Sequence, residues 1–251
     1  MFRRRLTLLH TESTRDPIPL AIGTVALSPT APRVVAAGGE AELDALAAAD
    51  TADVVELRVD LFVDPRPDTL PPILDRLRAA GRPVVVTVRA ASEGGQPLDE
   101  RLRRDLYAAA LAHADAIDVE IGSTALVADI VPRARALART VILSAHVLDR
   151  TPPVAVLTDL ATRARDLGGD VPKLVTHARG LDDVATLLAV TLAERTRGIV
   201  TLAMGTAGPL SRLALPAAGS LLTYGHVGRP TAPSGQLLAS ELAALLRRLA
   251  R

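Results

Sequence analysis

The sequence predicts an α/β protein, specifically a (β/α)8 TIM barrel, and three observations carry that prediction. Eight short apolar runs rich in β-branched residues alternate with Ala-, Leu- and Arg-rich segments whose apolar residues recur every three or four positions. Such alternation is typical of parallel strands joined by crossover helices. The chain has 251 residues, near the usual length of one barrel. Ionic residues also gather near the ends of several apolar runs, where barrel enzymes place their active sites.

The eight predicted strands follow one another from residue 33 to residue 224. They span residues 33–37, 53–58, 83–89, 116–121, 140–146, 171–177, 198–204 and 219–224. The segments between them, such as 40–49, 98–114 and 181–195, have helical spacing. The Pro-rich stretch 64–72 predicts a stiff loop with proline at the start of the next helix. We therefore expect a single catalytic barrel domain spanning residues 1–251.

The first thirty residues lie outside this repeat. They contain two short apolar pieces, 6–9 and 18–25, which predict a β-hairpin that closes the bottom of the barrel. The basic start, Met-Phe-Arg-Arg-Arg, is followed by an apolar piece too short for a signal peptide. No apolar stretch is long enough to cross a membrane. We expect a soluble, cytoplasmic protein.

Composition excludes several classes of function. The net charge is +1 with both signs spread along the chain, which argues against a nucleic-acid partner. The chain has no cysteine, so it has neither disulfides nor thiolate metal sites. No cluster of His, Asp and Glu has the spacing of metal ligands, and no Gly-rich phosphate loop is present. We expect neither a metal nor a cofactor.

Lys173 is the only lysine among 29 basic residues. Arginine stays protonated under ordinary conditions, whereas a lysine amine can lose its proton and act as a nucleophile. A lone lysine in an apolar strand therefore suggests Schiff-base formation with a ketone or aldehyde. The alternative is that the chain-wide excess of arginine left one lysine by chance.

Alternation of side chains along each strand predicts where the ionic residues point. The outward positions of the second and third strands are apolar and are expected to meet the helices. The expected inward-facing residues are Glu56, Arg58, Thr87, Arg89, Asp118, Glu120, His146, Lys173, Val175 and His177. Buried charges are costly unless they pair with each other or with a ligand. This set therefore predicts an active site, with internal salt bridges that only fix the strand register as the alternative.

The chemistry that suits this set is imine formation. Crowding by Arg58 and Arg89 is expected to favour the neutral amine of Lys173 through like-charge repulsion. A nearby imidazole, His146, can move protons through the carbinolamine and imine stages. Arginines beyond those needed for pairing suggest a substrate that carries a carboxylate or phosphate.

The remaining polar residues are assigned lesser parts. His177 is expected to line the mouth of the barrel, and Asp60 to cap the loop that follows its strand. Asp118 and Glu120 are expected to pair internally, without direct contact with the reacting atoms.

Several motifs, in order and at matching intervals, resemble the type I 3-dehydroquinate dehydratases, the Schiff-base barrel enzymes of the shikimate pathway. They are found at residues 55–60, 87–95, 117–120, 144–146, 151–152, 171–173, 211–213 and 231–236. The resemblance runs from about residue 32 to 247. It implies a TIM-barrel lyase, a hydro-lyase that converts 3-dehydroquinate to 3-dehydroshikimate during aromatic amino acid biosynthesis. It also implies a small-molecule substrate, no nucleic-acid or membrane partner, and a homodimer.

The resemblance also implies residue roles. Lys173 forms the imine, His146 is the general acid and base, and Glu93 sets the orientation and charge of the histidine. The implied substrate-binding residues are Glu56, Arg58, Arg89, Arg212, Thr231 and Gln236. Arg212 is expected to hold the substrate carboxylate, and Glu56 and Arg58 its hydroxyl groups.

This chain departs from the family pattern at several positions. The closing loop, Thr231-Ala-Pro-Ser-Gly-Gln236, has one residue more than usual, so Thr231 or Ser234 could supply the hydroxyl. Val147 stands where Asp is usual and Ala37 where Ser is frequent. Two further pocket positions differ, with Leu202 for a common Met and Tyr224 for a common Phe.

Two other functions compete with this prediction. One is a class I aldolase or transaldolase acting on a sugar phosphate through a lysine imine. The other is a catalytically weak homologue that binds the cyclic hydroxy acid without forming an imine.

Overall fold

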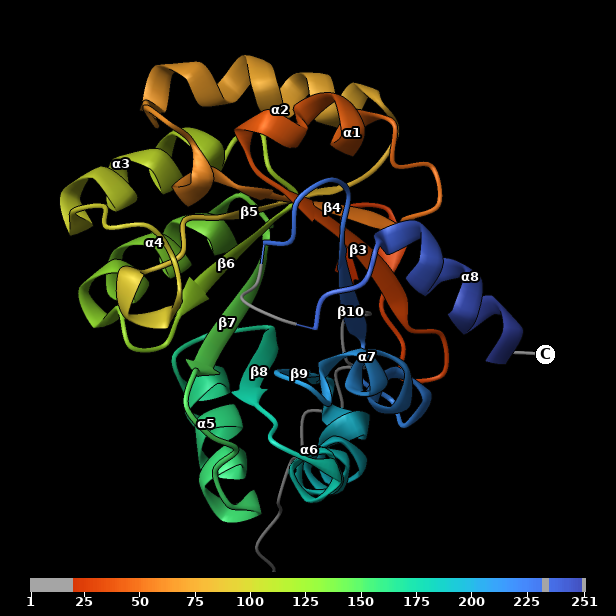
Figure 1. The fold of residues 1–251 in the computed structure, drawn as a ribbon. Helices are drawn as coiled ribbons and strands as arrows, with labels where there is room; N and C mark the ends of the chain where they lie inside the picture. Colours follow the sequence, from red (N-terminus) through yellow and green to blue (C-terminus); the bar gives the residue numbers. More distant parts are fainter. Residues whose placement is uncertain (1–19, 232–234, 250–251) are drawn as a thin grey trace, which may run out of the picture.

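The computed structural model describes residues 20–231 and 235–249. In this part of the chain, eight parallel strands form one sheet in the order β10-β3-β4-β5-β6-β7-β8-β9. The sheet curls into a nearly closed barrel surrounded by helices (Figure 1). Its strands are β3 (Arg33–Gly38), β4 (Val54–Arg58), β5 (Val84–Thr87), β6 (Ala116–Glu120), β7 (Thr140–Val147), β8 (Val171–His177), β9 (Val200–Met204) and β10 (Leu222–His226). The predicted TIM-barrel fold is confirmed.

A helix follows each strand and covers the outside of the barrel. The helices are α1 (Leu43–Ala47), α2 (Leu70–Ala79), α3 (Glu100–Ala110), α4 (Thr124–Ala136), α5 (Val154–Asp166), α6 (Leu181–Glu194), α7 (Gly208–Ala217) and α8 (Ala239–Leu249). Prolines occupy the first turn of α2, as the Pro-rich loop predicts. The outward-facing residues of β4 and β5 (Val55, Leu57 and Val86), and Val88 directly after β5, pack in the core between the sheet and the helices. None of the described helices is long and apolar enough to cross a membrane.

The barrel closes between β9 and β10 by a mixed backbone and side-chain contact. The Leu221 amide donates to the carbonyl oxygen of Ile199 at 2.9 Å. Next to it, the Ser220 hydroxyl accepts the Thr201 amide at 3.0 Å. The sequence pattern predicts a strand over 219–224, whereas β10 begins at Leu222 and runs to His226. The predicted start is wrong: residues 220 and 221 precede β10 and contact residues 201 and 199 where the barrel closes.

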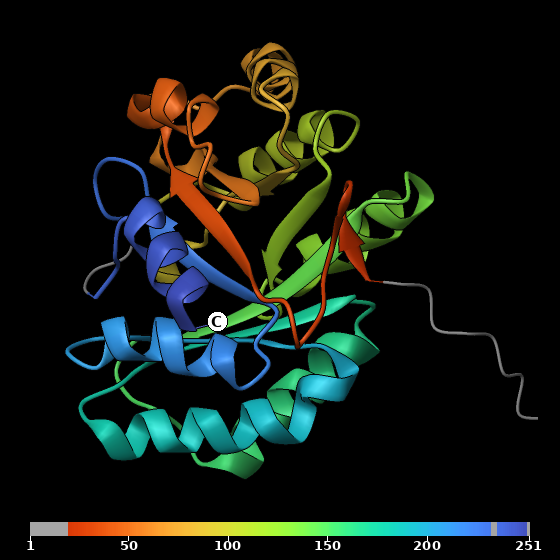
Figure 2. The same cartoon turned by 90° about the vertical axis from the view of Figure 1, so that its right-hand side faces the viewer.

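A hairpin closes the bottom of the barrel, as predicted, although both of its strands come from residues 21–26. β1 (Ala21–Ile22) pairs antiparallel with β2 (Val25–Ala26), and Gly23 in the turn has a φ of +54°. The apolar piece 6–9 lies outside the described residues. Ile22 is fully buried inside the barrel, against residues from the N-terminal ends of the strands. In Figure 2 the hairpin, in red, lies at the end of the barrel from which β3 runs away.

The side chains inside the barrel change from apolar to polar along the barrel axis. At the bottom it holds an apolar layer that includes Val35, Val54, Val85, Ile142 and Val171. Two residues further along, the inward positions of β4, β5, β7 and β8 carry charged or hydroxyl side chains, and that of β3 carries Ala37. These polar side chains are Glu56, Thr87, Ser144 and Lys173. The apolar layer thus forms the floor on which the polar site is built.

Candidate active site

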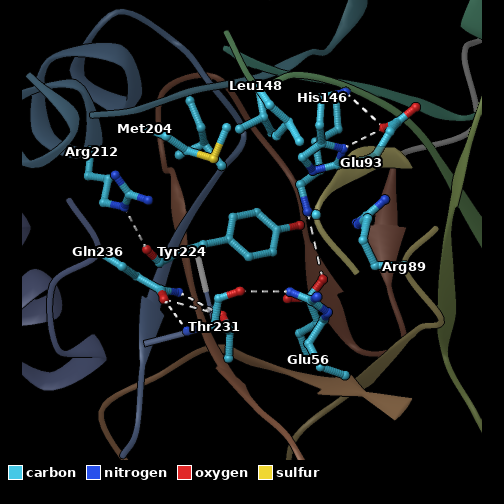
Figure 3. Close-up of a pocket in the computed structure, with 15 residues that line it drawn as sticks. Glu56, Arg89, Glu93, His146, Leu148, Met204, Arg212, Tyr224, Thr231 and Gln236 are labelled. Carbon is cyan, nitrogen blue, oxygen red and sulfur yellow. Dashed lines mark hydrogen bonds and ion pairs between the residues drawn. The ribbon is translucent and has the colours of Figure 1, made fainter. Parts of the chain in front are cut away.

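A pocket opens at the carboxyl ends of the strands. It contains about 560 Å³ of space, counting the part that is open to solvent. All nine site residues predicted from the sequence line it: Glu56, Arg58, Arg89, Glu93, His146, Lys173, Arg212, Thr231 and Gln236. Figure 3 shows these side chains converging around the ring of Tyr224. The structure therefore brings the whole predicted set into one place.

Lys173 lies on the floor of this pocket and pairs with carboxylates. Its Nζ atom lies 2.7 Å from Oδ2 of Asp118 and 3.7 Å from Oε1 of Glu56. The lysine side chain is almost completely buried, because β8 turns it inward between β7 and β9. Of the two arginines expected to crowd Lys173, Arg89 shares Asp118 with it, whereas Arg58 pairs with Asp60.

Arg89 is the centre of a buried network of charges. Its guanidinium contacts Asp118 at 3.0 Å and Glu120 at 2.8 Å, and it also donates to the Ser144 hydroxyl at 2.7 Å. Burial would lower the pKa of Arg89, but the two carboxylates hold it well above its usual value. Burial would likewise raise the pKa of Asp118, but Arg89 and Lys173 hold it well below its usual range. Glu120 is therefore an internal partner, as predicted, whereas Asp118 pairs internally and also contacts Nζ of Lys173.

Arg58 is held by Asp60, two residues further along the chain. The pair is bidentate, with Nε to Oδ1 at 2.8 Å and Nη2 to Oδ2 at 2.7 Å. The prediction that Asp60 only caps a loop is wrong. Asp60 is fully buried and also accepts the Arg89 amide at 3.1 Å, because the chain turns inward in a short 3-10 helix directly after β4. Its two contacts fix Arg58 to the end of β5.

His146 and Glu93 form a close pair at the mouth of the pocket. Nδ1 of the imidazole lies 2.8 Å from Oε2 of Glu93, and the same oxygen accepts the His146 amide at 2.9 Å. Burial, together with the charges of Arg89 and Lys173, lowers the pKa of His146 well below its usual value. Burial raises the pKa of Glu93 to about 7. With Nδ1 held by the carboxylate, Nε2 of the neutral imidazole is left to act as a base.

Glu93 reaches His146 because of a tight turn after β5. Ala91–Glu93 forms a single 3-10 turn, and Gly94 follows it with a φ of +90°. A Cβ atom on Gly95 would lie 2.0 Å from the carbonyl oxygen of Arg89, so only glycine fits there. The pair of glycines therefore lets the chain fold back over its own strand and brings the carboxylate to the imidazole.

Arg212 lies on the opposite side of the pocket, in the first turns of α7. It is buried, and it donates to the carbonyl oxygens of Tyr224, Ala203 and Gly208 at 2.8–3.1 Å. No carboxylate within residues 20–231 and 235–249 forms an ion pair with it. Burial lowers its pKa to about 10, and the side chain therefore still carries its charge at neutral pH. A buried guanidinium without a negative partner suits the binding of an anion.

Thr231, which follows β10, is hydrogen-bonded to β4 and to Gln236. Nη1 of Arg58 donates to the carbonyl oxygen of Thr231 at 3.1 Å. The Gln236 amide oxygen accepts the Thr231 amide at 2.7 Å, and its amide nitrogen donates to the Thr231 hydroxyl at 3.1 Å. Ser234 lies outside the described residues. Of the two candidate hydroxyls, that of Thr231 lies at the pocket and is bound to Gln236.

The sequence pattern did not reveal two buried polar residues of α3 that bond to the strands behind the pocket. Arg103 in α3 pairs with Glu120 and donates to the carbonyl oxygen of Val88 at 3.0 Å. The Tyr107 hydroxyl donates to the carbonyl oxygen of Asp118 at 2.6 Å. The available signal is the helical spacing, because residues 103, 106, 107 and 110 share the buried face of α3. A charged residue on an apolar face is a sign of an internal partner.

One residue expected at the mouth of the pocket lies outside it. His177 ends β8 but does not line the pocket, so its predicted place at the mouth is wrong. Its backbone is instead held by residues 150 and 151, with the His177 amide donating to the Arg150 carbonyl and its own carbonyl accepting from Thr151. Within the described ranges, no group of three or more His, Asp and Glu side chains is arranged to hold a metal ion.

Known proteins with similar sequences are dehydratases. The chain is 35% identical over 217 residues to the 3-dehydroquinate dehydratase of Methanocella arvoryzae, covering 86% of this chain and 96% of that protein. It is 35% identical over 204 residues to the enzyme of the same name from Klebsiella pneumoniae, covering 76% of this chain and 80% of that one.

Solved structures agree. The type I 3-dehydroquinate dehydratase from Clostridium difficile, a structure with covalently modified comenic acid, superposes with a TM-score of 0.83 at 27% identity, covering 92% of this chain and 97% of that one. The 3-dehydroquinate dehydratase from Geobacillus kaustophilus superposes with a TM-score of 0.82 at 26% identity, covering 93% and 96%. A family model described as Type I 3-dehydroquinase matches residues 34–251. The chain belongs to the type I 3-dehydroquinase family, whose members dehydrate 3-dehydroquinate.

Proposed function

We propose that this protein dehydrates 3-dehydroquinate to 3-dehydroshikimate through an imine on Lys173, with His146 as the general acid and base. The observation that carries the proposal is the placement of a buried lysine amine, a neutral imidazole and a buried arginine without a carboxylate partner around one pocket. These are the three groups that imine-assisted elimination from a hydroxy acid needs. The covalently modified ligand in the Clostridium difficile relative also supports covalent chemistry.

Binding places the substrate between two charged walls. Arg212 binds the carboxylate, because its charge lacks a negative partner among the described residues and its three backbone contacts fix its direction. Glu56 and Arg58 on the far wall bind the hydroxyl groups. Arg89 stays paired with Asp118 and Glu120, and its charge is balanced by theirs. Thr231 and Gln236 cover the bound substrate from the loop after β10.

The reaction then proceeds in two halves. Lys173 gives a proton to His146, and its free amine attacks the C3 ketone to form a carbinolamine. The imidazolium returns this proton to the carbinolamine hydroxyl, which leaves as water and gives a protonated imine. The iminium withdraws electrons and makes the neighbouring C2 proton acidic. His146 removes this proton through Nε2, the C1 hydroxyl leaves with a proton from the resulting imidazolium, and water releases the product from Lys173. The low dielectric of the buried site strengthens each of these charge effects.

Glu93 supports the histidine throughout the cycle. Its carboxylate accepts a hydrogen bond from the Nδ1–H group, which fixes the tautomer in which Nε2 is the base. When His146 becomes protonated, the same carboxylate stabilises the imidazolium. Val147, which stands where the family usually has Asp, leaves this task to Glu93.

The test is to follow the absorbance of the enone product while the protein is incubated with 3-dehydroquinate, with and without borohydride. We expect turnover, and we expect borohydride to abolish it only when substrate is present, because reduction fixes the imine. A binding homologue would give neither an absorbance change nor inactivation. Inactivation by borohydride with a sugar phosphate but not with 3-dehydroquinate would favour an aldolase and contradict the proposal.

Family membership supports two further proposals. We propose that the protein works as a homodimer, which sedimentation equilibrium at micromolar concentration would test, since a monomer mass would contradict it. We also propose that it acts in the cytoplasm. The absence of cysteine supports this, because a reducing compartment places no demand for disulfides. Fractionation of the source cells would test this location.

A further inference from the structure

Tyr224 is the one polar side chain, among the described residues that line the pocket, that the reaction described above does not use. It lies on the inward face of β10 and is only 4% exposed. Lys173 Nζ lies over its ring, 3.8 Å from the centroid. In Figure 3 the ring is in the middle of the labelled side chains, with its hydroxyl directed away from Arg212 and toward the side of the pocket that holds Arg89 and His146.

The Tyr224 hydroxyl has no hydrogen-bond partner in the part of the chain that the structure describes. A buried hydroxyl without a partner costs free energy, because it loses its hydrogen bonds to water and forms none within the protein. Phenylalanine at this position would fill the same space without that cost. The cost is offset if a ligand in the pocket accepts the hydrogen bond.

Geometry identifies which ligand atom that is. The amine of Lys173 lies over the face of the ring and the hydroxyl lies at the edge of the same ring. When Nζ bonds to a carbonyl carbon, the oxygen on that carbon is carried beside Nζ and comes within reach of the phenol. Val175, Leu202 and Met204 also line this pocket, beside its charged side chains, and offer the phenol no hydrogen-bond acceptor on their side chains.

We propose that the Tyr224 hydroxyl donates a hydrogen bond to the oxygen of the substrate carbonyl as Lys173 attacks it, and so acts as a further catalytic residue for imine formation. This proposal rests on the proposed function. In the step, the bond from Nζ to the carbonyl carbon forms while the π bond of the carbonyl breaks, and the electron pair moves to the oxygen. The phenol holds this oxygen and keeps its own proton.

The charge state of Tyr224 agrees with this role. Burial, together with the negative charges of Glu56 and Asp118, raises the pKa of the phenol well above its usual value. The hydroxyl is therefore a donor at every pH at which the protein would work, and it is not a base. A donor that is already in place stabilises the negative charge as it develops on the carbonyl oxygen. It therefore accelerates the chemical step more than it strengthens substrate binding.

The chain offers a matched control, because it contains two tyrosines. Tyr107 is also fully buried, but its hydroxyl is bonded to backbone groups behind the sheet and does not line the pocket. Tyr224→Phe and Tyr107→Phe make the same chemical change at the two positions. A role confined to stability would give Tyr224→Phe the same pattern as Tyr107→Phe.

The experiment is a rapid-quench measurement of imine formation, in which 3-dehydroquinate is mixed with enzyme and borohydride-reduced protein is measured by mass. We expect Tyr224→Phe to slow imine formation and kcat by at least about tenfold, with a smaller change in KM and an unchanged or higher Tm. Tyr107→Phe should lower Tm and leave the imine rate within about twofold of the parent, since its hydroxyl does not meet the substrate.

Equal imine rates in the parent protein and Tyr224→Phe would overturn the role of Tyr224 while leaving the imine mechanism in place. A lowered Tm of Tyr224→Phe with an unchanged imine rate would assign its hydroxyl to the fold alone and also overturn it. Failure of the parent protein itself to gain mass would overturn the imine mechanism, and the role of Tyr224 with it.

Discussion

A single oxygen of Glu93 holds both the ring and the backbone of His146, at 2.8 Å from Nδ1 and 2.9 Å from the amide nitrogen. The imidazole therefore cannot rotate or shift along its strand without losing two contacts to one carboxylate. Because burial raises the pKa of Glu93 to about 7, the charge of this carboxylate changes within the physiological range. The pair links the orientation of the base to pH.

The first prediction concerns the pH dependence of kcat. Above about pH 7 Glu93 is ionised and stabilises the imidazolium of His146, and below it this charge is lost. The kcat of the parent protein should therefore fall as pH decreases through about 7. Glu93→Gln should have a lower kcat at pH 8, by about 10- to 100-fold, and no inflection near pH 7. An inflection that persists in Glu93→Gln would assign this titration to another group.

The second prediction concerns stability at the same residue. In the folded protein the pKa of Glu93 is about 7, against 4.5 for the free side chain, so folding disfavours the ionised form. The protonated form is present in both states below about pH 4.5, and the destabilisation develops as pH rises from there through 7. Chemical denaturation should show Glu93→Gln gaining up to about 3 kcal/mol relative to the parent protein between pH 5 and pH 8. A difference that does not change with pH would contradict the buried-carboxylate explanation.

The third prediction tests Arg212 as the carboxylate-binding group. Arg212→Lys keeps the charge but cannot reproduce three backbone contacts and a planar donor pair, so KM should rise at least about tenfold. The measurement compares 3-dehydroquinate with its methyl ester. The parent protein should strongly prefer the acid, and Arg212→Lys should lose most of that preference. An unchanged preference would place the carboxylate elsewhere in the pocket.

The fourth prediction concerns the buried network behind the pocket. Arg103→Met leaves the buried carboxylate of Glu120 with one arginine in place of two, and should lower the free energy of unfolding by about 3 kcal/mol. Arg104→Met is the matched control, because Arg104 lies next along α3 and its pair with Asp129, at 3.5 Å, is about 40% exposed. The control should change stability by less than about 0.5 kcal/mol. Equal effects would mean that Arg103 contributes no more than a surface arginine.

The sequence alone predicts the barrel and the floor of the site, because both depend on short-range periodicity. Alternation along β4 and β8 is sufficient to place Glu56 and Lys173 inside, since a strand sends every second side chain to the same face. The repeat of strand and helix then fixes which ends of the strands meet. Five of the nine pocket residues follow from this alternation: Glu56, Arg58, Arg89, His146 and Lys173. The other four lie on loops or on α7 and were expected only from the family resemblance: Glu93, Arg212, Thr231 and Gln236.

What the sequence does not predict are the pairings. Arg58 and Arg89 were expected to stand beside Lys173 as free charges, whereas Asp60 and Asp118 engage them. Which carboxylate pairs with which cation depends on distances across the barrel. The alternation of side chains along a strand gives no information on these distances. Arg103 was missed for a similar reason, because its partner lies on a strand and its own position is on a helix. The unpartnered hydroxyl of Tyr224 also emerges only from three-dimensional contacts.

The central claim is that Lys173 is the amine that forms the imine, and the single lysine makes it directly testable. The measurement is peptide mass mapping after incubation with 3-dehydroquinate and reduction with borohydride, on the parent protein and on Lys173→Arg. The parent protein should carry one reduced adduct on the peptide that contains Lys173. Lys173→Arg should fold, keep the charge, carry no adduct and lose at least about 1000-fold in turnover. An unmodified parent protein, or substantial turnover by Lys173→Arg, would contradict the account.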